Sequence, residues 1–135
     1  MKKKFGRKKD HREHMERNLL TSLVLYEKID TTKTKAKDIS SSFDKLMTTA
    51  KKNNDNAKKK ISSVLFDSKS AAKVFEVLVP RYKNRASGYT TMINLSNRKG
   101  DNSTICRLEL MDKKATLVEK KTEDKKEIVK TTKDS

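Results

Sequence analysis

Apolar side chains recur at helical spacing over much of the chain. Residues 10–28 carry them in a widened stripe, which predicts an amphipathic helix of about five turns. Residues 29–32 are β-branched, which favours a short strand or a strand-like connector. Three more helices are expected: one ending at Ala50, one running through Leu65 and one stopped at Pro80, which lacks an amide hydrogen. The four apolar faces comprise Met15, Leu19, Leu20, Leu23, Val24 and Tyr26; Ile39, Phe43, Leu46, Met47 and Ala50; Ala57, Ile61, Val64 and Leu65; and Ala71, Val74, Phe75 and Leu78.

Polar residues with short side chains mark where these helices begin. Asp10 and Glu13 have the spacing of a capping box, in which a side-chain oxygen accepts from exposed amides of the first turn. The later helices are expected to be capped by Thr32 or Thr34, by Asp55 or Asn56, and by Ser68 or Ser70.

The apolar period changes from helical to alternating near the end of the chain. Tyr89, Thr91, Ile93 and Leu95 alternate with polar residues, and so do Cys106, Leu108 and Leu110. The turn-forming residues 97–102 lie between the two stretches, which predicts a β-hairpin with a basic tip. Helices followed by a hairpin indicate an α+β fold, with about four helices packed on a small mixed sheet.

Three segments are expected in the chain. Residues 1–9 lack apolar periodicity and predict a basic extended N-terminal arm. Residues 10–111 form the single folded domain, and residues 112–135 are a charged tail expected to be disordered.

Charge is the strongest functional signal. The 135 residues include 34 Lys or Arg and 18 Asp or Glu, a formal net charge of +16. The tail carries little of this excess, whereas the first twelve residues are densely basic. A strongly basic chain attracts polyanions, so the expected partner is nucleic acid or an anionic membrane surface.

Arginine is scarce and clustered. It occurs on either side of a long arginine-free stretch, at Arg7, Arg12 and Arg17 and again at Arg81, Arg85, Arg98 and Arg107. Because the planar guanidinium binds phosphate through two hydrogen bonds and stacks on bases, these clusters indicate two contact surfaces, unless the few arginines fell there by chance.

Sites for catalysis or cofactors are not expected. His11 and His14 have no third histidine to complete a metal site and fit better as phosphate or base contacts. Cys106 lies in an alternating apolar stretch, where a small buried side chain is the favoured interpretation. Neither a glycine-rich phosphate loop nor a nucleophile with its base is present, and no cofactor is predicted.

The segment from Arg81 to Thr90 mixes cations, amides, hydroxyls and two tyrosines. Such a loop binds phosphates through Arg and Lys while a tyrosine stacks on an unpaired base. The alternative is a helix-to-strand connection with both Tyr82 and Tyr89 in the core, which we favour for Tyr89. Residues 58–60, all lysine, fit either a phosphate contact or a solvated helix face.

Three blocks of motif residues follow one another along most of the chain. The first comprises Gly6-Arg7, His11-Arg12, Met15, Arg17-Asn18-Leu19, Ser22-Leu23, Glu27 to Thr32 and Lys35 to Asp38. The second comprises Ala72-Lys73, Phe75, Leu78, Pro80-Arg81-Tyr82, Arg85-Ala86 and Gly88-Tyr89-Thr90, and the third Arg98 to Asn102 and Leu108-Glu109-Leu110. Together they resemble the bacterial family of large-subunit ribosomal protein seventeen. The chain departs from the family pattern in its many Lys and Ser residues, in Asp38 where Glu is usual, and in its lysine-rich tail.

The resemblance implies a cytoplasmic, ribosome-bound protein that binds large-subunit (23S) ribosomal RNA and supports subunit assembly and translation. It further implies a place near the nascent-chain tunnel exit, beside the proteins numbered twenty-two and thirty-two. We expect neither a membrane partner nor a homo-oligomer. The RNA contacts are assigned to Lys2, Lys3, Lys4, Arg7, Lys8, Lys9, His11, Arg12, His14, Arg17, Arg81, Lys83, Arg85, Arg98 and Lys99.

Two other functions compete with this assignment. A nucleoid-type DNA-binding protein would share the basic charge but would not prefer structured RNA to duplex DNA. A peripheral membrane protein would need the first helix to present its apolar face to lipid, whereas that face is better explained as domain core.

Overall fold

The protein is described by a computed structural model over residues 3–112. Lys2 and the predicted disordered tail beyond Asp112 lie outside these residues. The helices are α1 (Lys9–Tyr26), α2 (Lys33–Ala50), α3 (Asp55–Val64) and a last helical segment that joins α4 (Ser68–Lys73), the π-helical η1 (Val74–Leu78) and α5 (Val79–Arg81). The strands are β1 (Lys28–Thr32), β2 (Thr90–Asn97) and β3 (Thr104–Leu110).

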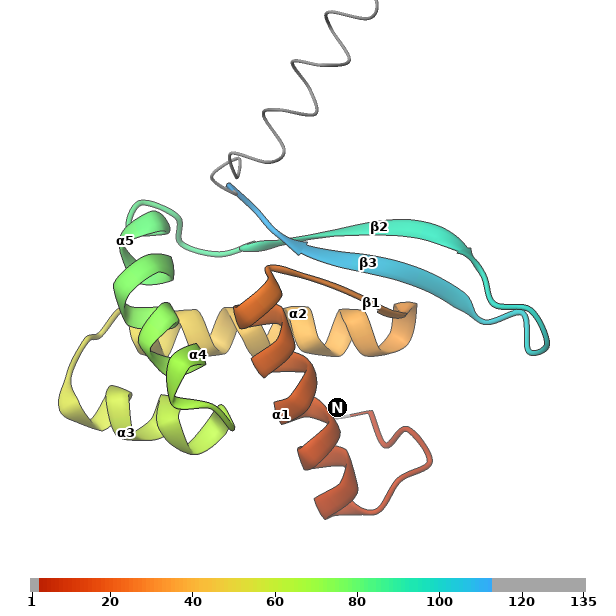
Figure 1. Ribbon diagram of the computed structural model, residues 1–135, viewed down its shortest axis with the longest axis horizontal. Coiled ribbons are helices and arrows are strands. Elements are labelled where there is room, and N and C mark those ends of the chain that lie inside the picture. The colour runs from red at the N-terminus through yellow and green to blue at the C-terminus, as the bar shows by residue number, and fades with distance from the viewer. Residues whose placement is uncertain (1–2, 113–135) are drawn as a thin grey trace, which may run out of the picture.

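The α+β class predicted from the pattern is confirmed. The strands form a sheet in the order β1–β3–β2, and both pairings are antiparallel. The sheet was expected to be mixed, and this detail of the prediction is wrong. Figure 1 shows α1 and α2 beneath the sheet, the segment from α3 to α5 at one end, and the β2–β3 turn projecting at the other. The last two strands form the predicted hairpin, and the predicted short strand at residues 29–32 is β1.

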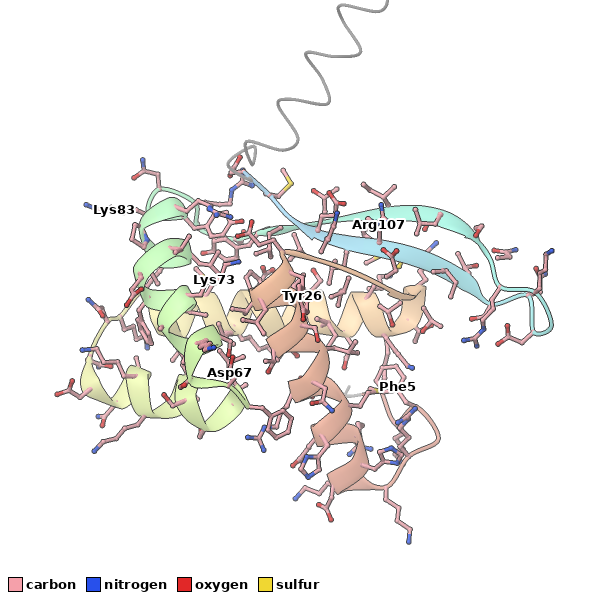
Figure 2. The ribbon with its side chains drawn as sticks, in the orientation of Figure 1. Phe5, Tyr26, Asp67, Lys73, Lys83 and Arg107 are labelled. Carbon is pink, nitrogen blue, oxygen red and sulfur yellow. The ribbon has the colours of Figure 1, made fainter. Side chains whose placement is uncertain are left out.

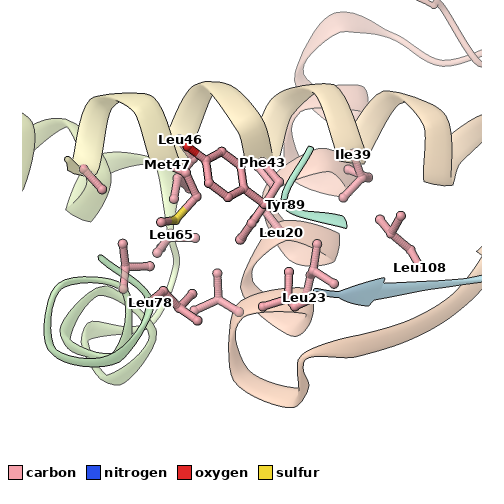
Figure 3. Packing of buried hydrophobic residues seen from close by; sticks show 14 of the residues in the cluster. Leu20, Leu23, Ile39, Phe43, Leu46, Met47, Leu65, Leu78, Tyr89 and Leu108 are labelled. Atoms are coloured by element: carbon pink, nitrogen blue, oxygen red, sulfur yellow. The ribbon is translucent and has the colours of Figure 1, made fainter. Parts of the chain in front are cut away.

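One apolar core joins the helices to the sheet. Leu23 of α1, Phe43 of α2, Leu78 of η1 and Leu108 of β3 are each fully buried, and Tyr89 meets them from the start of β2 (Figure 3). Cys106 is buried on the same side of β3, as the alternation predicted, and burial raises the pKa of its thiol.

Two of the helix caps differ from the prediction. The side chain of Asn54 accepts from the amide of Ala57 at the start of α3, and Asp67 caps α4. Each lies one residue before the nearer of the expected pair, because an N-cap residue precedes the first helical residue and has extended backbone.

The capping box predicted for α1 is wrong. The helix begins at Lys9, with Lys8 at the cap position and no side-chain cap hydrogen bond. Asp10 therefore lies inside the first turn, where its negative charge still complements the positive end of the helix dipole. At α2 the cap position is Thr32, one of the two expected residues, also without a side-chain hydrogen bond.

Pro80 does not stop the last helical segment. The amide of Val79 donates to the carbonyl of Val74, five residues back, in a widened π turn. Shifting the hydrogen-bond pattern just before the proline accommodates a residue that has no amide hydrogen to donate. The chain therefore remains helical as far as Arg81, with the amide of Tyr82 donating to the carbonyl of Leu78 at 3.0 Å.

The alternation on β2 identifies the outer face of the sheet. Met92 lies opposite the buried Leu108 and packs against the core, so Ile93 points away from the helices. The register shifts between Asn94 and Ser96, and Ile93 and Leu95 both remain 44% exposed. The apolar period was therefore read correctly as a strand, but these two residues are not part of the core.

Candidate nucleic-acid interface

The N-terminal arm contacts the folded domain before it enters α1. The segment 3–8 forms no helix or strand, and it bends once, where the amide of Arg7 donates to the carbonyl of Lys4 at 3.1 Å. Phe5 and Gly6 inside this turn both have positive φ, 55° and 61°, which glycine adopts without strain. Lys3 donates to the carbonyl of Thr34 at 3.3 Å and thereby fixes the start of the arm against α2.

Exposed cations cover the arm and the first turns of α1. Lys4, Lys8, Lys9 and His11 are exposed, and Arg12 is half-buried. Arg7 donates to Nε2 of His11 at 2.8 Å, which joins the arm to the helix face. The structure thus brings together the predicted contact residues of the arm and of the first turns of α1 on one end of the molecule.

Arg17 is held by the protein itself. Its Nε donates to the carbonyl of Val64 at 3.0 Å and its Nη2 to that of Ser63 at 2.8 Å, at the C-terminal end of α3. Its guanidinium also lies over the ring of Phe66, 4.1 Å from the ring centroid. This arginine fastens α1 to α3, and two of its three nitrogens are already donating.

Arg81 also points inward. It forms a two-point ion pair with Glu27, at 2.8 and 3.2 Å, and its side chain is only 10% exposed. Lys73 adds a contact of 3.0 Å to the same carboxylate. Burial by itself would raise the pKa of Glu27, but the hydrogen bonds from Arg81 and Lys73 outweigh it and leave that pKa below its ordinary value.

The loop after Arg81 is built around two buried tyrosines. Tyr82 and Tyr89 are each 1% exposed, so neither is available to stack on a base, and the core interpretation holds for both. The Tyr82 hydroxyl donates to the carbonyl of Met111, and burial raises its pKa. Arg85 contacts Asp112 at 3.0 Å, whereas Lys83 is exposed (Figure 2).

The hairpin tip carries two exposed cations, one of which is paired. Arg98 donates twice to Asp101, and these bonds, together with the amide of Ser103, lower the pKa of Asp101 to about 2. Lys99 beside it is exposed. The tip lies at the far end of the molecule from the loop that bears Lys83 (Figure 1).

The predicted contact residues therefore fall on three separate regions. They differ in whether their charged groups already contact other parts of the protein. Among the residues that the structure describes, those of the arm and of the start of α1 are clustered and are exposed or half-buried, whereas Arg17 and Arg81 are engaged inside the fold. Sequence reasoning missed Phe66, which is 47% exposed in the α3–α4 connection. The sequence holds one indication of Phe66, which is that this aromatic residue directly follows Leu65, the last residue of a predicted apolar helix face.

The described residues also bear on two other functions, metal binding and membrane insertion. Residues 3–112 contain no group of three or more His, Cys, Asp or Glu side chains that could hold a metal ion. No described helix is both long and apolar enough to cross a membrane.

Comparison with known proteins decides the family. Residues 15–111 match the family described as ribosomal protein L17. The chain belongs to the ribosomal protein L17 family. The match begins inside α1, so the arm lies before it.

Curated relatives agree with the L17 assignment. The large ribosomal subunit protein bL17 of Desulforudis audaxviator is 39% identical over 109 residues, which make up 81% of this chain and 97% of the relative. The bL17 protein of Syntrophotalea carbinolica is 37% identical over 126 residues, covering 93% of this chain and 81% of the relative. Membership of the L17 family makes the chain a bacterial large-subunit ribosomal protein that serves translation on cytoplasmic ribosomes, and not an enzyme.

Proposed function

We propose that this L17-family protein binds large-subunit (23S) ribosomal RNA chiefly through its N-terminal arm and the first turns of α1. By neutralising phosphates of neighbouring RNA segments, the bound arm supports assembly of the subunit. Lys83 and the hairpin tip at Arg98 and Lys99 supply further phosphate contacts. The observation that carries the proposal is the clustering of exposed cations on the arm and at the start of α1, while Arg17 and Arg81 are engaged inside the fold.

The full contact set is kept within this proposal, with different roles. Lys2, Lys3, Lys4, Arg7, Lys8, Lys9, His11, Arg12 and His14 belong to the principal surface, and Arg85 contributes at its loop. Arg17 and Arg81 act mainly by positioning the helices that carry the contacts.

The resemblance to the family favours a position near the nascent-chain tunnel exit, with the proteins numbered twenty-two and thirty-two as neighbours. We assign a protein neighbour to the outer face of the sheet. On that face Arg107 is paired with Asp30 through two hydrogen bonds of 2.7 and 2.8 Å, and Lys28 faces Glu109 in the strand register. Balanced charges beside exposed Ile93 and Tyr26 suit a protein surface better than a phosphate backbone.

The test compares two arginines that are both half-buried. Arg12→Ala removes a cation from the proposed RNA surface, and Arg107→Ala removes one from the outer sheet face. Affinity for protein-free large-subunit RNA is measured over a range of salt concentrations. The wild-type affinity should fall about 10³–10⁵-fold between roughly 50 and 200 mM salt, if about 6–10 phosphates are contacted. Arg12→Ala should reduce the salt slope by about 1, and Arg107→Ala should leave it unchanged.

Three results would contradict this proposal. A nearly flat salt response would exclude a phosphate-dominated contact. Equal effects of the two substitutions would mean that the contact surface is misplaced. Equal affinity for duplex DNA of the same length would favour the alternative function, a nucleoid-type DNA-binding protein, because a ribosomal RNA ligand is recognised by its shape and unpaired bases.

A further inference from the structure

Three flat side chains lie together on the surface between α1 and the α3–α4 connection. His14 and Arg17 come from successive turns of α1. Phe66 lies between the end of α3 and Asp67, and Figure 2 labels Asp67. The imidazole of His14 and the phenyl ring of Phe66 are parallel to within 2°, with their centroids 5.7 Å apart. The guanidinium of Arg17 lies over the Phe66 ring.

The phenyl ring is held in place from several directions. Arg17, which covers the ring, is itself fixed by its two hydrogen bonds to the end of α3. The amide of Phe66 donates to Oγ1 of Thr21 at 3.3 Å, and that hydroxyl donates to the carbonyl of Arg17 at 2.8 Å. Phe66 is therefore positioned before any ligand arrives, which lowers the entropy cost of binding to it.

Part of the aromatic surface remains uncovered. Carbon atoms in contact lie about 3.5–4.0 Å apart, so parallel rings with centroids at 5.7 Å are displaced sideways and overlap only in part. Phe66 is 47% exposed and His14 is exposed. Single exposed apolar residues are common on protein surfaces, but here a phenyl ring that is held in place lies beside a parallel imidazole, so the two rings present aromatic faces of one orientation.

We propose that His14 and Phe66 form a stacking site for one unpaired RNA base. The proposal rests on the RNA-binding function above and adds a contact that reads an unstacked base rather than phosphate. Unpaired bases in RNA loops and bulges stack on aromatic rings and on guanidinium planes. His14 lies on α1 about one turn beyond His11, so a strand whose phosphates contact the start of α1 can reach the site.

The test uses the full chain and protein-free large-subunit RNA at physiological salt. Phe66→Leu removes the ring and keeps an apolar side chain, whereas Phe66→Trp keeps a flat face. Tyr26→Leu is the matched control, because Tyr26 is an aromatic residue with 71% exposure that lies outside the stack. Phe66→Leu should weaken binding roughly 5–150-fold with no change in salt slope, while Phe66→Trp and Tyr26→Leu should bind as the wild type does.

The outcomes separate this site from the general RNA-binding function. Wild-type affinity for Phe66→Leu, within about twofold, would overturn the stacking site while leaving the salt-dependent contact in place. If the wild type binds large-subunit RNA no better than duplex DNA of the same length, the proposed function is contradicted, and the stacking site, which rests on it, is contradicted as well. If thermal unfolding shows that Phe66→Leu does not fold, His14→Ala decides through its salt slope, because His14 also belongs to the proposed phosphate-contact surface. Weakened binding with an unchanged slope supports the stacking site, whereas wild-type binding, or weakened binding with a reduced slope, overturns it.

Discussion

Glu27 connects three parts of the fold at the end of α1. Its left-handed backbone, with φ of 59°, ends the helix, and its carbonyl accepts from the amide of Leu110 at 2.9 Å. Its carboxylate pairs with Arg81 and Lys73 of the last helical segment. One residue thus joins α1, β3 and the segment that leads into the Arg81–Thr90 loop.

Removing this charge should destabilise the protein and alter its response to acid. Glu27→Gln leaves Arg81 partly buried without its ionic partner and should lower the free energy of unfolding by about 1.5–3 kcal/mol. Because the folded-state pKa of Glu27 lies below its ordinary value of 4.5, its contribution is present above that pH and is lost as the pH falls through the folded pKa. Urea unfolding at neutral pH and at acid pH should therefore show the difference between wild type and variant shrinking below about pH 4.5.

The control for this experiment is Glu76→Gln, which changes an exposed glutamate of the same helical segment. It should alter stability by less than about 0.5 kcal/mol. A difference between wild type and Glu27→Gln that stays constant with pH would show that the carboxylate charge is not what stabilises this junction.

At the residue scale the sequence could not separate the arginines that are held inside the fold from the others. Arg12 and Arg17 look alike in the sequence, and so do Arg81 and Arg85. Arg17 and Arg81 differ in that each is fastened to another helix, Arg17 to the Ser63 carbonyl of α3 and Arg81 to the carboxylate of Glu27 at the end of α1. Such pairings depend on how helices pack, and helical periodicity carries no information on them.

At the scale of elements, period and composition predicted most of the fold. The helices and the hairpin lie close to their predicted ranges because each has its own apolar period, and the short first strand does so because its residues are β-branched. The errors lie at the ends and in the sheet. Pro80 remains in the helix through a neighbouring π turn, and the face of Ile93 is settled by its pairing opposite Arg107, which periodicity alone cannot give.

The start of α3 gives a direct test of the corrected caps. Asn54→Ala removes the side-chain oxygen that accepts from the Ala57 amide at 2.8 Å and should lower the free energy of unfolding by about 1 kcal/mol. Asn56→Ala, at one of the two residues that the sequence offered as a cap, should change it by less than about 0.5 kcal/mol. Urea denaturation of both variants checks this, and a larger loss for Asn56→Ala would contradict the assigned cap.

At the scale of the whole molecule, charge is distributed by region. The arm and the first turns of α1 present clustered cations, while the outer sheet face pairs Arg107 with Asp30 and exposes Ile93. A protein bound between RNA and protein neighbours needs surfaces of both kinds. The net charge of +16 pointed to a polyanion, but only the fold showed which cations remain exposed to reach it.

The most direct test of the central claim is gradient separation of ribosomal subunits at low magnesium. Lysates come from cells whose only copy is either the full chain or a chain that begins at Lys9, and the protein is quantified in the large-subunit fraction after a moderate salt wash. We predict about one copy per subunit for the full chain and a marked loss for the shortened one, because the arm supplies phosphate contacts. Equal retention of the two chains would contradict the claim that the arm is a principal RNA contact.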